Sequence, residues 1–573
     1  MLLKACVVVN IYAPSGSDKR QERSSFFRED VFQALHMFPE SRLVLGGDFN
    51  CILSPLDVEN GFGYNQKMCM TLKDLVSSHN LLDAFRISSP RVEEFTFFRP
   101  GKAPSRLDRF YVSQCFSSSD ACHVPSLSDH SAVILKIKAK NNVHKQIKRG
   151  RTTYWKLNTA ILEDDEFMPS FKQFWHDVSS SKNDFTDIAE WWDLLAKPNI
   201  KGFCIEFSKI MRKRRNDTVR FLHSCLKLAL EEKNWSEVAR IKGELHKIFL
   251  KDTLGIIIRS RYQQNAEEER GSLFHAAREM KNVKNNITSL KIEGKVVHDK
   301  KMIESAVTSF FGALFNGHHG SDLQNTGAPF TPDYSYLQEF LDVLVSMNCV
   351  DSENMTVDIT QDEMDYVIKN CKNNKSPGLD GLPYEFYKCV YPVIGVDLRC
   401  VLQCQLDRGE LISSNTLGAT RLTPKVSGIP QVDELRPITL LNTDYKVLSK
   451  ILVLRIKPVL PQIITSGQLC TVGDKNILFG VSNILSKIFH VKSKKEKACL
   501  ISLDFFKAYD RVVIDYLVKV MKKMNFSPVF CDWIRMLHKG AKTRFILDEL
   551  SQIIDVCFSI RQGDPLSMIL YIL

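Results

Sequence analysis

Short apolar runs alternate with helically spaced apolar residues over the first 138 positions of the chain. The runs predict strands over residues 6–12, 42–45, 95–99, 107–113 and 132–137. Apolar residues three and four apart between Phe26 and Leu35 predict a helix after the first strand. Polar residues stand where the strands end, which is where α/β folds place their chemistry. The pattern therefore predicts an α/β unit over residues 1–138.

The rest of the chain favours helices. Residues 155–280 have a helical pattern, with an apolar stripe through Trp235, Val238, Ile241, Leu245 and Ile248. A single helix over residues 219–250 would be about 48 Å long. Further on, the pattern predicts helices over residues 401–407 and 449–459, the second closed by Pro461, and a buried strand over residues 498–503 that ends at Asp504.

A basic segment divides the chain. Residues 136–156 contain eight Lys and Arg residues and no Asp or Glu, and a second basic group covers residues 212–215. The first is either a solvated linker or a segment that contacts phosphates or directs nuclear import. The helices that follow either pack as a solvated arm or lie along nucleic acid. We therefore predict three regions, which cover residues 1–138, 139–349 (a basic, mostly helical linker region) and 350–573.

Composition and charge favour a protein that stays inside the cell. The 573 residues carry a net charge of +11, which is compatible with a nucleic-acid partner. Sixteen cysteines occur without any C-x-x-C spacing, so a disulfide framework and a zinc finger are disfavoured. No apolar run reaches the roughly 18 residues of a membrane helix, so we expect no membrane association.

The chain opens on a predicted strand and closes inside an apolar stretch, so we expect a fragment of a longer protein.

Three polar motifs stand at the ends of predicted strands of the first region: GGDFN at residues 46–50 follows a strand, while SRLD at residues 105–108 and SDH at residues 128–130 lead into strands. The glycines allow a sharp turn that projects Asp48 and Asn50 from one strand end. A carboxylate or imidazole can activate water, while polar donors or a metal ion can hold phosphoryl oxygens. Either Asp108 or Asp129 can orient His130. Together the motifs predict a metal-dependent phosphodiesterase site.

Three further motifs lie in the last region: LRPI at residues 435–438, ISLDFFKAYDRV at residues 501–512 and RQGDPLS at residues 561–567. Asp504 ends the predicted strand, and nucleotidyl transfer needs clustered carboxylates that hold two Mg²⁺ ions about 3.5–4 Å apart. Arg436 suits bidentate phosphate contact, and Gln562 lies in a glycine-turned loop. One Asp cannot form such a cluster alone, so the motifs together indicate a polymerase palm that is cut short.

Residues 9–137 resemble the endonuclease/exonuclease/phosphatase family, in particular the apurinic-type endonuclease of LINE-type retrotransposons. The resemblance rests on the three motifs of the first region, on VNIYAP at residues 9–14 and on TF at residues 96–97. It implies catalytic roles for Tyr12, Asp48, Asn50, Asp108, Asp129 and His130. By this resemblance Asp48 and Asn50 act on the water and the phosphate. Tyr12 supplies a phosphate-site hydroxyl, and His130 contacts or protonates the phosphoryl group. Asp108 and Asp129 support the site. The family also uses an Asn and a metal-binding Glu that would precede Met1.

Residues 350–573 are similar to the fingers and first half of the palm of a LINE-type reverse transcriptase. Besides the motifs above, KSPGLDGLP at residues 375–383 matches that family, and YWKLN and IRSR at residues 154–158 and 258–261 resemble the region between nuclease and polymerase. The resemblance implies that Asp504 is the first metal-binding Asp and that Tyr509 excludes a ribose 2′-hydroxyl. It also implies that Gln562 lines the incoming nucleotide and that Arg436 contacts its phosphates. The later Asp-Asp box of the family would follow Leu573.

The two resemblances imply one parent protein that nicks DNA and copies RNA into DNA, with Mg²⁺ as cofactor and element RNA and target DNA as partners. The implied fold is a partial four-layer α/β sandwich, a helical linker and a partial right-hand polymerase. For this polypeptide itself we expect little or no catalysis. The alternatives are a non-catalytic nucleic-acid-binding remnant, or a phosphoesterase with an inert polymerase-like tail. The expected location is the nucleus, the cytoplasm or both.

Overall fold

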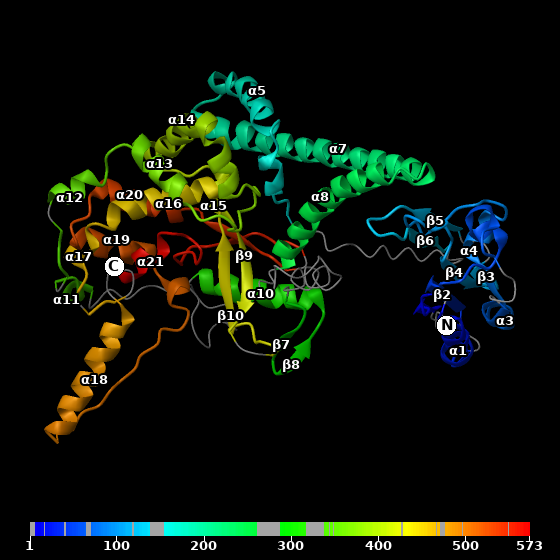
Figure 1. The fold of residues 1–573 in the computed structure, drawn as a ribbon. Coiled ribbons are helices and arrows are strands. Elements are labelled where there is room, and N and C mark those ends of the chain that lie inside the picture. The colour runs from blue at the N-terminus through cyan, green and yellow to red at the C-terminus, as the bar shows by residue number, and fades with distance from the viewer. Residues whose placement is uncertain are drawn as a thin grey trace. The chain divides into compact units, whose positions relative to one another are not determined.

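The computed structural model forms two compact units, one of residues 1–148 with 212–282 and one of residues 149–211 with 283–573 (Figure 1). The structure describes residues 6–16, 18–38, 42–64, 70–116, 120–137, 154–260, 287–316, 337–342, 344–347, 349–425, 428–465, 467–469, 476–495, 497–547 and 549–573. Most of the basic segment over residues 136–156 therefore lies outside the described residues, and so do residues 261–286. The region boundaries at residues 138 and 349 stay predictions.

The first unit is built on a four-stranded sheet of order β1-β2-β4-β3. Strand β1 (Cys6–Tyr12) runs parallel to β2 (Arg42–Asp48), and β4 (Asp108–Ser113) is antiparallel to both β2 and β3 (Leu81–Asp83). Two parallel neighbours need a crossover, which the helical stretch of α1 (Arg20–Phe26), a π turn (Phe27–Val31) and α2 (Phe32–His36) provides. The same unit contains α3 (Met70–Ser78), α4 (Ala84–Ser88) and the β5–β6 pair (Asp120–Val124, Ala132–Lys136).

Most strands predicted in this unit are confirmed to within one to three residues at their ends. The predicted helix through residues 26–35 is confirmed too, because Phe27, Val31 and Leu35 are buried against the sheet residues Leu43 and Leu45. The predicted strand over residues 95–99 is wrong. There, Phe97 alone forms isolated bridges, with Ser105 and His130.

Two helices, not one, cover residues 219–250. Helix α7 (Lys197–Glu231) ends before Lys233, whose φ of 54° lies in the left-handed region, and α8 (Trp235–Ser260) follows. Asn234 starts the second helix, since its side-chain Oδ1 accepts the Glu237 N–H at 3.2 Å. The predicted apolar stripe is confirmed, because Val238, Ile241 and Leu245 are buried against α7. We call residues 219–250 the hairpin.

The second unit holds a four-stranded sheet of order β10-β9-β11-β12 and the β7–β8 pair (Leu290–Ile292, Lys295–Val297). The sheet strands are β9 (Leu417–Pro424), β10 (Leu435–Leu440), β11 (Lys542–Phe545) and β12 (Ile554–Asp555). The first helices are α5 (Phe167–Ser179), α6 (Ile188–Trp191), α10 (Lys300–Phe315), α11 (Leu337–Asp342), α12 (Cys349–Asn354), α13 (Gln361–Asn370) and α14 (Tyr384–Arg408). Later ones are α15 (Ser413–Thr416), α16 (Thr443–Ile456), α17 (Leu460–Ile463), α18 (Ile477–Ser493), α19 (Ile514–Lys523), α20 (Pro528–His538) and α21 (Ser567–Ile572).

The predicted helix over residues 401–407 lies within α14, and the one over residues 449–459 is α16, which ends at Ile456. Pro461 stands in the first turn of α17 and does not close α16. The predicted buried strand over residues 498–503 is wrong. The segment forms no strand with any described residue, and Leu503 is 82% exposed.

Helix α14 is long and apolar enough, by length and composition alone, to cross a membrane. Its residues Phe386, Val390, Ile394 and Leu398 are fully buried in the core of the second unit. A buried core helix passes the same compositional test, so this feature is weak support for a membrane span.

A buried ion cluster ties the start of α7 to this core. The Lys197 ammonium lies 2.9 Å from the carboxylate of Asp444 and 3.5 Å from that of Asp380, and it donates to the Ser414 hydroxyl at 2.9 Å. Trp192 Nε1 donates to the same Asp444 at 3.1 Å. Burial alone would lower the pKa of Lys197, but the two carboxylates hold it above its ordinary value, so the lysine stays charged.

Candidate phosphodiester site

The end of β2 projects Asp48 from the sheet. Gly47, just before it, has a φ of 140°, and a Cβ there would lie 1.9 Å from the Ile11 carbonyl oxygen of β1. Only glycine fits that close approach. Asn50 then fixes the Asp48 carboxylate, because its backbone N–H donates to Oδ1 at 2.9 Å and its Nδ2 to Oδ2 at 3.1 Å.

The start of β4 brings Asp108 beside Asp48, since the two residues are register partners. Thr96 fixes this strand end, because its hydroxyl accepts the N–H groups of Leu107 at 2.9 Å and Asp108 at 3.0 Å. His130 approaches from the loop before β6, and its Nδ1 bonds Asp108 Oδ2 at 2.8 Å. The structure thus selects Asp108, of the two predicted carboxylates, as the partner of the imidazole.

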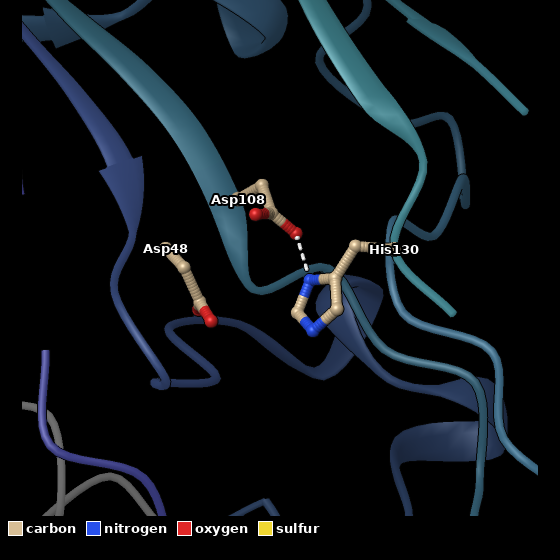
Figure 2. Close-up of side chains that lie close together, drawn as sticks. All are labelled: Asp48, Asp108 and His130. Carbon is tan, nitrogen blue, oxygen red and sulfur yellow. Dashed lines mark hydrogen bonds and ion pairs between the residues drawn. The ribbon is translucent and has the colours of Figure 1, made fainter. Parts of the chain in front are cut away.

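Asp48, Asp108 and His130 point toward one another, and one potential ligand atom from each lies within 4.8 Å of the others (Figure 2). Burial raises the pKa of Asp48, and the nearby Asp108 charge adds to that effect, while the Asn50 hydrogen bond opposes it. Two carboxylates and an imidazole are ligands that a divalent cation accepts. They are also groups that can move a proton.

The other residues predicted for this site lie at its edge. Tyr12 is the register partner of Asp48, and its side chain is 70% exposed. The Asp129 carboxylate is exposed and accepts the Ser128 hydroxyl at 3.1 Å, while its backbone oxygen accepts the Phe98 N–H. The structure therefore brings four of the six predicted residues into one group and leaves these two beside it.

Sequence reasoning missed a buried ion network beneath the site. Asp57, fully buried, accepts from Arg106 Nε at 2.8 Å, Arg86 at 2.7 Å and Arg109 at 3.2 Å, and Arg106 also binds Asp83 at 2.7 Å. Burial alone would raise the pKa of Asp57, but the arginines hold it well below its ordinary range. Because Arg106 stands two residues before Asp108, the network holds the chain where β4 begins. The only sequence signal was the mixture of Asp and Arg near these motifs.

Among the described residues, those predicted for nucleotidyl transfer do not form a cluster of metal ligands. Asp504 and Arg436 are exposed, the latter on β10, and the half-buried Tyr509 stacks on Tyr571 with ring centroids 4.7 Å apart. Gln562 is tied to the sheet by its backbone oxygen, which accepts the Thr439 N–H at 2.7 Å. The described residues contain one group of three or more potential metal ligands, and Asp504 is not part of it.

Gln562 faces a buried acid that the sequence did not single out. Its Nε2 lies 3.3 Å from both carboxylate oxygens of Asp510. Burial raises the pKa of Asp510 to about 6, although Lys507 opposes the shift, and burial lowers the pKa of Lys507 to about 8. Asp510 and Lys507 therefore lie in a poorly solvated place at the edge of the sheet.

Asp510→Asn should stabilise the second unit at pH 7.5 by about 1–3 kcal/mol. The folded chain binds this proton more tightly than the unfolded chain, because the ordinary pKa is 3.8 and the folded one about 6. The stabilisation that Asp510 gives the fold by binding a proton is therefore complete below about pH 4 and is lost as pH rises through about 6. The measurement is urea denaturation at pH 7.5 and pH 4, followed by tryptophan fluorescence, since five of the six tryptophans lie in this unit. The gain should vanish at pH 4, and the exposed control Asp555→Asn should change little at either pH. A loss of stability at pH 7.5 would show that the ionised form is needed.

Residues 423–573 match the sequence family "Reverse transcriptase (RNA-dependent DNA polymerase)". The chain is also 29% identical over 581 residues to a Xenopus laevis protein described as "Transposon TX1 uncharacterized 149 kDa protein". That alignment covers 98% of this chain and 43% of the relative, so the chain spans less than half of the relative's length. The predicted resemblance to a LINE-type transposon protein with reverse transcriptase sequence is confirmed.

Two solved structures are similar to part of the chain. An AP endonuclease from Archaeoglobus fulgidus is 20% identical with a TM-score of 0.21, over 23% of this chain and 62% of that one. A 3′–5′ exonuclease from Neisseria meningitidis is 22% identical with a TM-score of 0.19, over 23% and 61%. Scores this low do not define a shared fold. The mixed helix and strand content that we predicted is confirmed, and the four-layer sandwich and the fingers and palm stay predictions.

Proposed function

We propose that this chain belongs to a protein that nicks DNA and copies RNA into DNA. The chain is similar to LINE-type transposon proteins and has reverse transcriptase sequence at residues 423–573. The observation that carries the nicking function is the convergence of Asp48, Asp108 and His130 within 4.8 Å. The family match of residues 423–573 supports the copying function, with element RNA and target DNA as partners. The nucleus and the cytoplasm are the compartments where such partners meet.

The geometry supports a role for each side chain in phosphodiester hydrolysis. Asp108 accepts from Nδ1 of His130, so Nε2 is the nitrogen left to contact or protonate a phosphoryl oxygen. Asp48, whose pKa burial raises, is suited to take a proton from water. The Asn50 side chain holds that carboxylate in place and also donates to the Ala13 oxygen at 2.8 Å. Tyr12, at the edge, would offer its hydroxyl to the phosphate, and Asp129 would support the site.

A divalent cation fits the same group of residues. Asp48 and Asp108 offer the oxygen ligands that Mg²⁺ prefers, and His130 offers a nitrogen. A bound Mg²⁺ would supply charge stabilisation at phosphorus. At the other site, Asp504 would be one of several carboxylates required for nucleotidyl transfer, with Arg436, Tyr509 and Gln562 around the nucleotide.

Conversion of supercoiled plasmid to open circles tests the nicking function. The full chain should nick slowly with Mg²⁺ and not with EDTA, and Asp48→Asn should lower the rate by about 10²–10⁴-fold. Asp74→Asn, an exposed acid on α3, is the control and should keep the rate. If the wild-type chain does not nick at all, the phosphodiesterase proposal fails for this polypeptide, and the non-catalytic nucleic-acid-binding alternative is favoured.

Replacing Arg212, Lys213, Arg214 and Arg215 by Gln should weaken binding to nucleic acid and flatten its salt dependence. These four residues are exposed on α7. Each lost phosphate contact should reduce the slope of log affinity against log salt by about 0.9 on duplex DNA. Affinity should fall equally for all sequences, because phosphate contacts carry no base information. The measurement is binding to mixed-sequence RNA and DNA across a salt series. An unchanged slope would assign this group to a solvated helix surface.

A further inference from the structure

The hairpin contacts three separate loops within the first unit. Lys233 lies 2.8 Å from Glu59, Lys227 lies 3.5 Å from Glu94, and Lys242 donates to the backbone oxygen of Ser128. Between these polar contacts, Phe98 packs into the apolar cluster formed by the two hairpin helices. The loops of Glu59 and Glu94 connect strands of the sheet that carries Asp48 and Asp108, and the loop of Ser128 connects β5 to β6 and carries His130. The hairpin is therefore docked on that unit by both apolar and charged contacts.

One of the three contacts falls on the loop that carries His130. The loop is closed on itself, because the Ser126 hydroxyl donates to the His130 oxygen and the His130 N–H donates to the Ser128 hydroxyl at 3.2 Å. The Ser128 backbone oxygen points out of this turn to the Lys242 ammonium. Burial lowers the pKa of Lys242, while the Asp129 carboxylate opposes the shift, so the ammonium lies partly out of solvent beside the loop.

On its other side the same loop is held by the segment that also fixes Asp108. The Ser131 N–H donates to the Thr96 backbone oxygen at 2.6 Å, and the Phe97 ring packs against the His130 ring with centroids 5.0 Å apart. Thr96 in turn holds the Asp108 backbone N–H. The loop that carries the imidazole is therefore held between this segment and the hairpin.

We propose that Lys242 is a positioning residue of the phosphodiester site, which holds the loop at residues 126–131 so that His130 bonds Asp108. The hairpin is then a working part of the endonuclease-like unit, beyond the packing arm or nucleic-acid arm that the sequence allowed. The expected effect of Lys242 on catalysis rests on the proposed function, whereas its effect on the position of His130 does not depend on that function.

The test is the ring N–H resonance of His130 in the full chain labelled with ¹⁵N-histidine. A ring N–H bonded to a carboxylate resonates far downfield, and His130→Gln assigns it by removing it. Lys242→Gln should broaden or remove this resonance, and it should speed amide exchange at residues 128–131 by roughly tenfold. Lys242→Arg keeps a charged donor and should restore both. Lys247→Gln, which removes the same charge from an exposed position of the same helix, should change neither.

An unchanged His130 resonance in Lys242→Gln would overturn the proposal, and so would an equal change in Lys247→Gln. Lys242→Met keeps the apolar stem of the side chain, and the same expectations hold for it if the Gln variant does not fold. In plasmid nicking, Lys242→Gln should lower kcat and leave KM for DNA nearly unchanged, because the effect passes through His130. If the wild type does not nick, the proposed function fails, while the resonance and the exchange rates still decide the role of Lys242.

Discussion

Replacing Lys197 by methionine should destabilise the second unit by about 3–5 kcal/mol. The lysine side chain is 5% exposed, and the Asp444 carboxylate that it binds is fully buried. Methionine matches the length of the stem but leaves Asp444 and Asp380 without their cation in a medium that solvates charge poorly. Removing one partner of a buried ion pair costs far more than the pair contributes, because the remaining charge stays buried.

Urea denaturation followed by tryptophan fluorescence measures this loss. Lys209→Met is the matched control, because Lys209 lies on the same helix and pairs with Glu206 at 2.6 Å, yet both side chains are about two-thirds exposed. The control should change the free energy of unfolding by less than about 0.5 kcal/mol. A cost below about 1 kcal/mol for Lys197→Met would mean that water reaches the two carboxylates.

His130→Gln should lower the rate of plasmid nicking by about 10²–10⁴-fold. Glutamine is close in size and polar, but it cannot donate or accept a proton as imidazole does, and it loses the charge-assisted bond to Asp108. The control is His36→Gln, an exposed histidine at the end of α2, which should keep the wild-type rate. Equal rates for wild type and His130→Gln would remove the histidine from the chemistry.

The sequence predicted where the site residues lie in the chain better than how they meet. The ends of β2 and β4 could be placed because apolar runs stop at polar motifs, and this located Asp48 and Asp108. The choice between Asp108 and Asp129 as partner of His130 could not be made. It depends on Thr96 and Phe97, which fix the orientation of a loop some thirty positions later.

The errors have physical causes of the same kind. One helix was predicted over residues 219–250 because apolar residues recur on both sides of residues 232–234, but a left-handed Lys233 interrupts the helix there. The apolar run over residues 498–503 predicted a buried strand, but a strand also needs a backbone partner, and no described residue pairs with it. The network around Asp57 joins residues from distant segments, so no local pattern could reveal it.

The central claim is that Asp108 and His130 act as one unit on a phosphodiester, and a double-mutant cycle on plasmid nicking tests it most directly. Asp108→Asn and His130→Gln should each lower the rate by about 10²–10⁴-fold, and the double variant should lose little more than either single variant. Such non-additivity is expected because Asp108 acts through the imidazole that it orients, at 2.8 Å. Single variants that retain the wild-type rate, or losses that simply add, would contradict the claim.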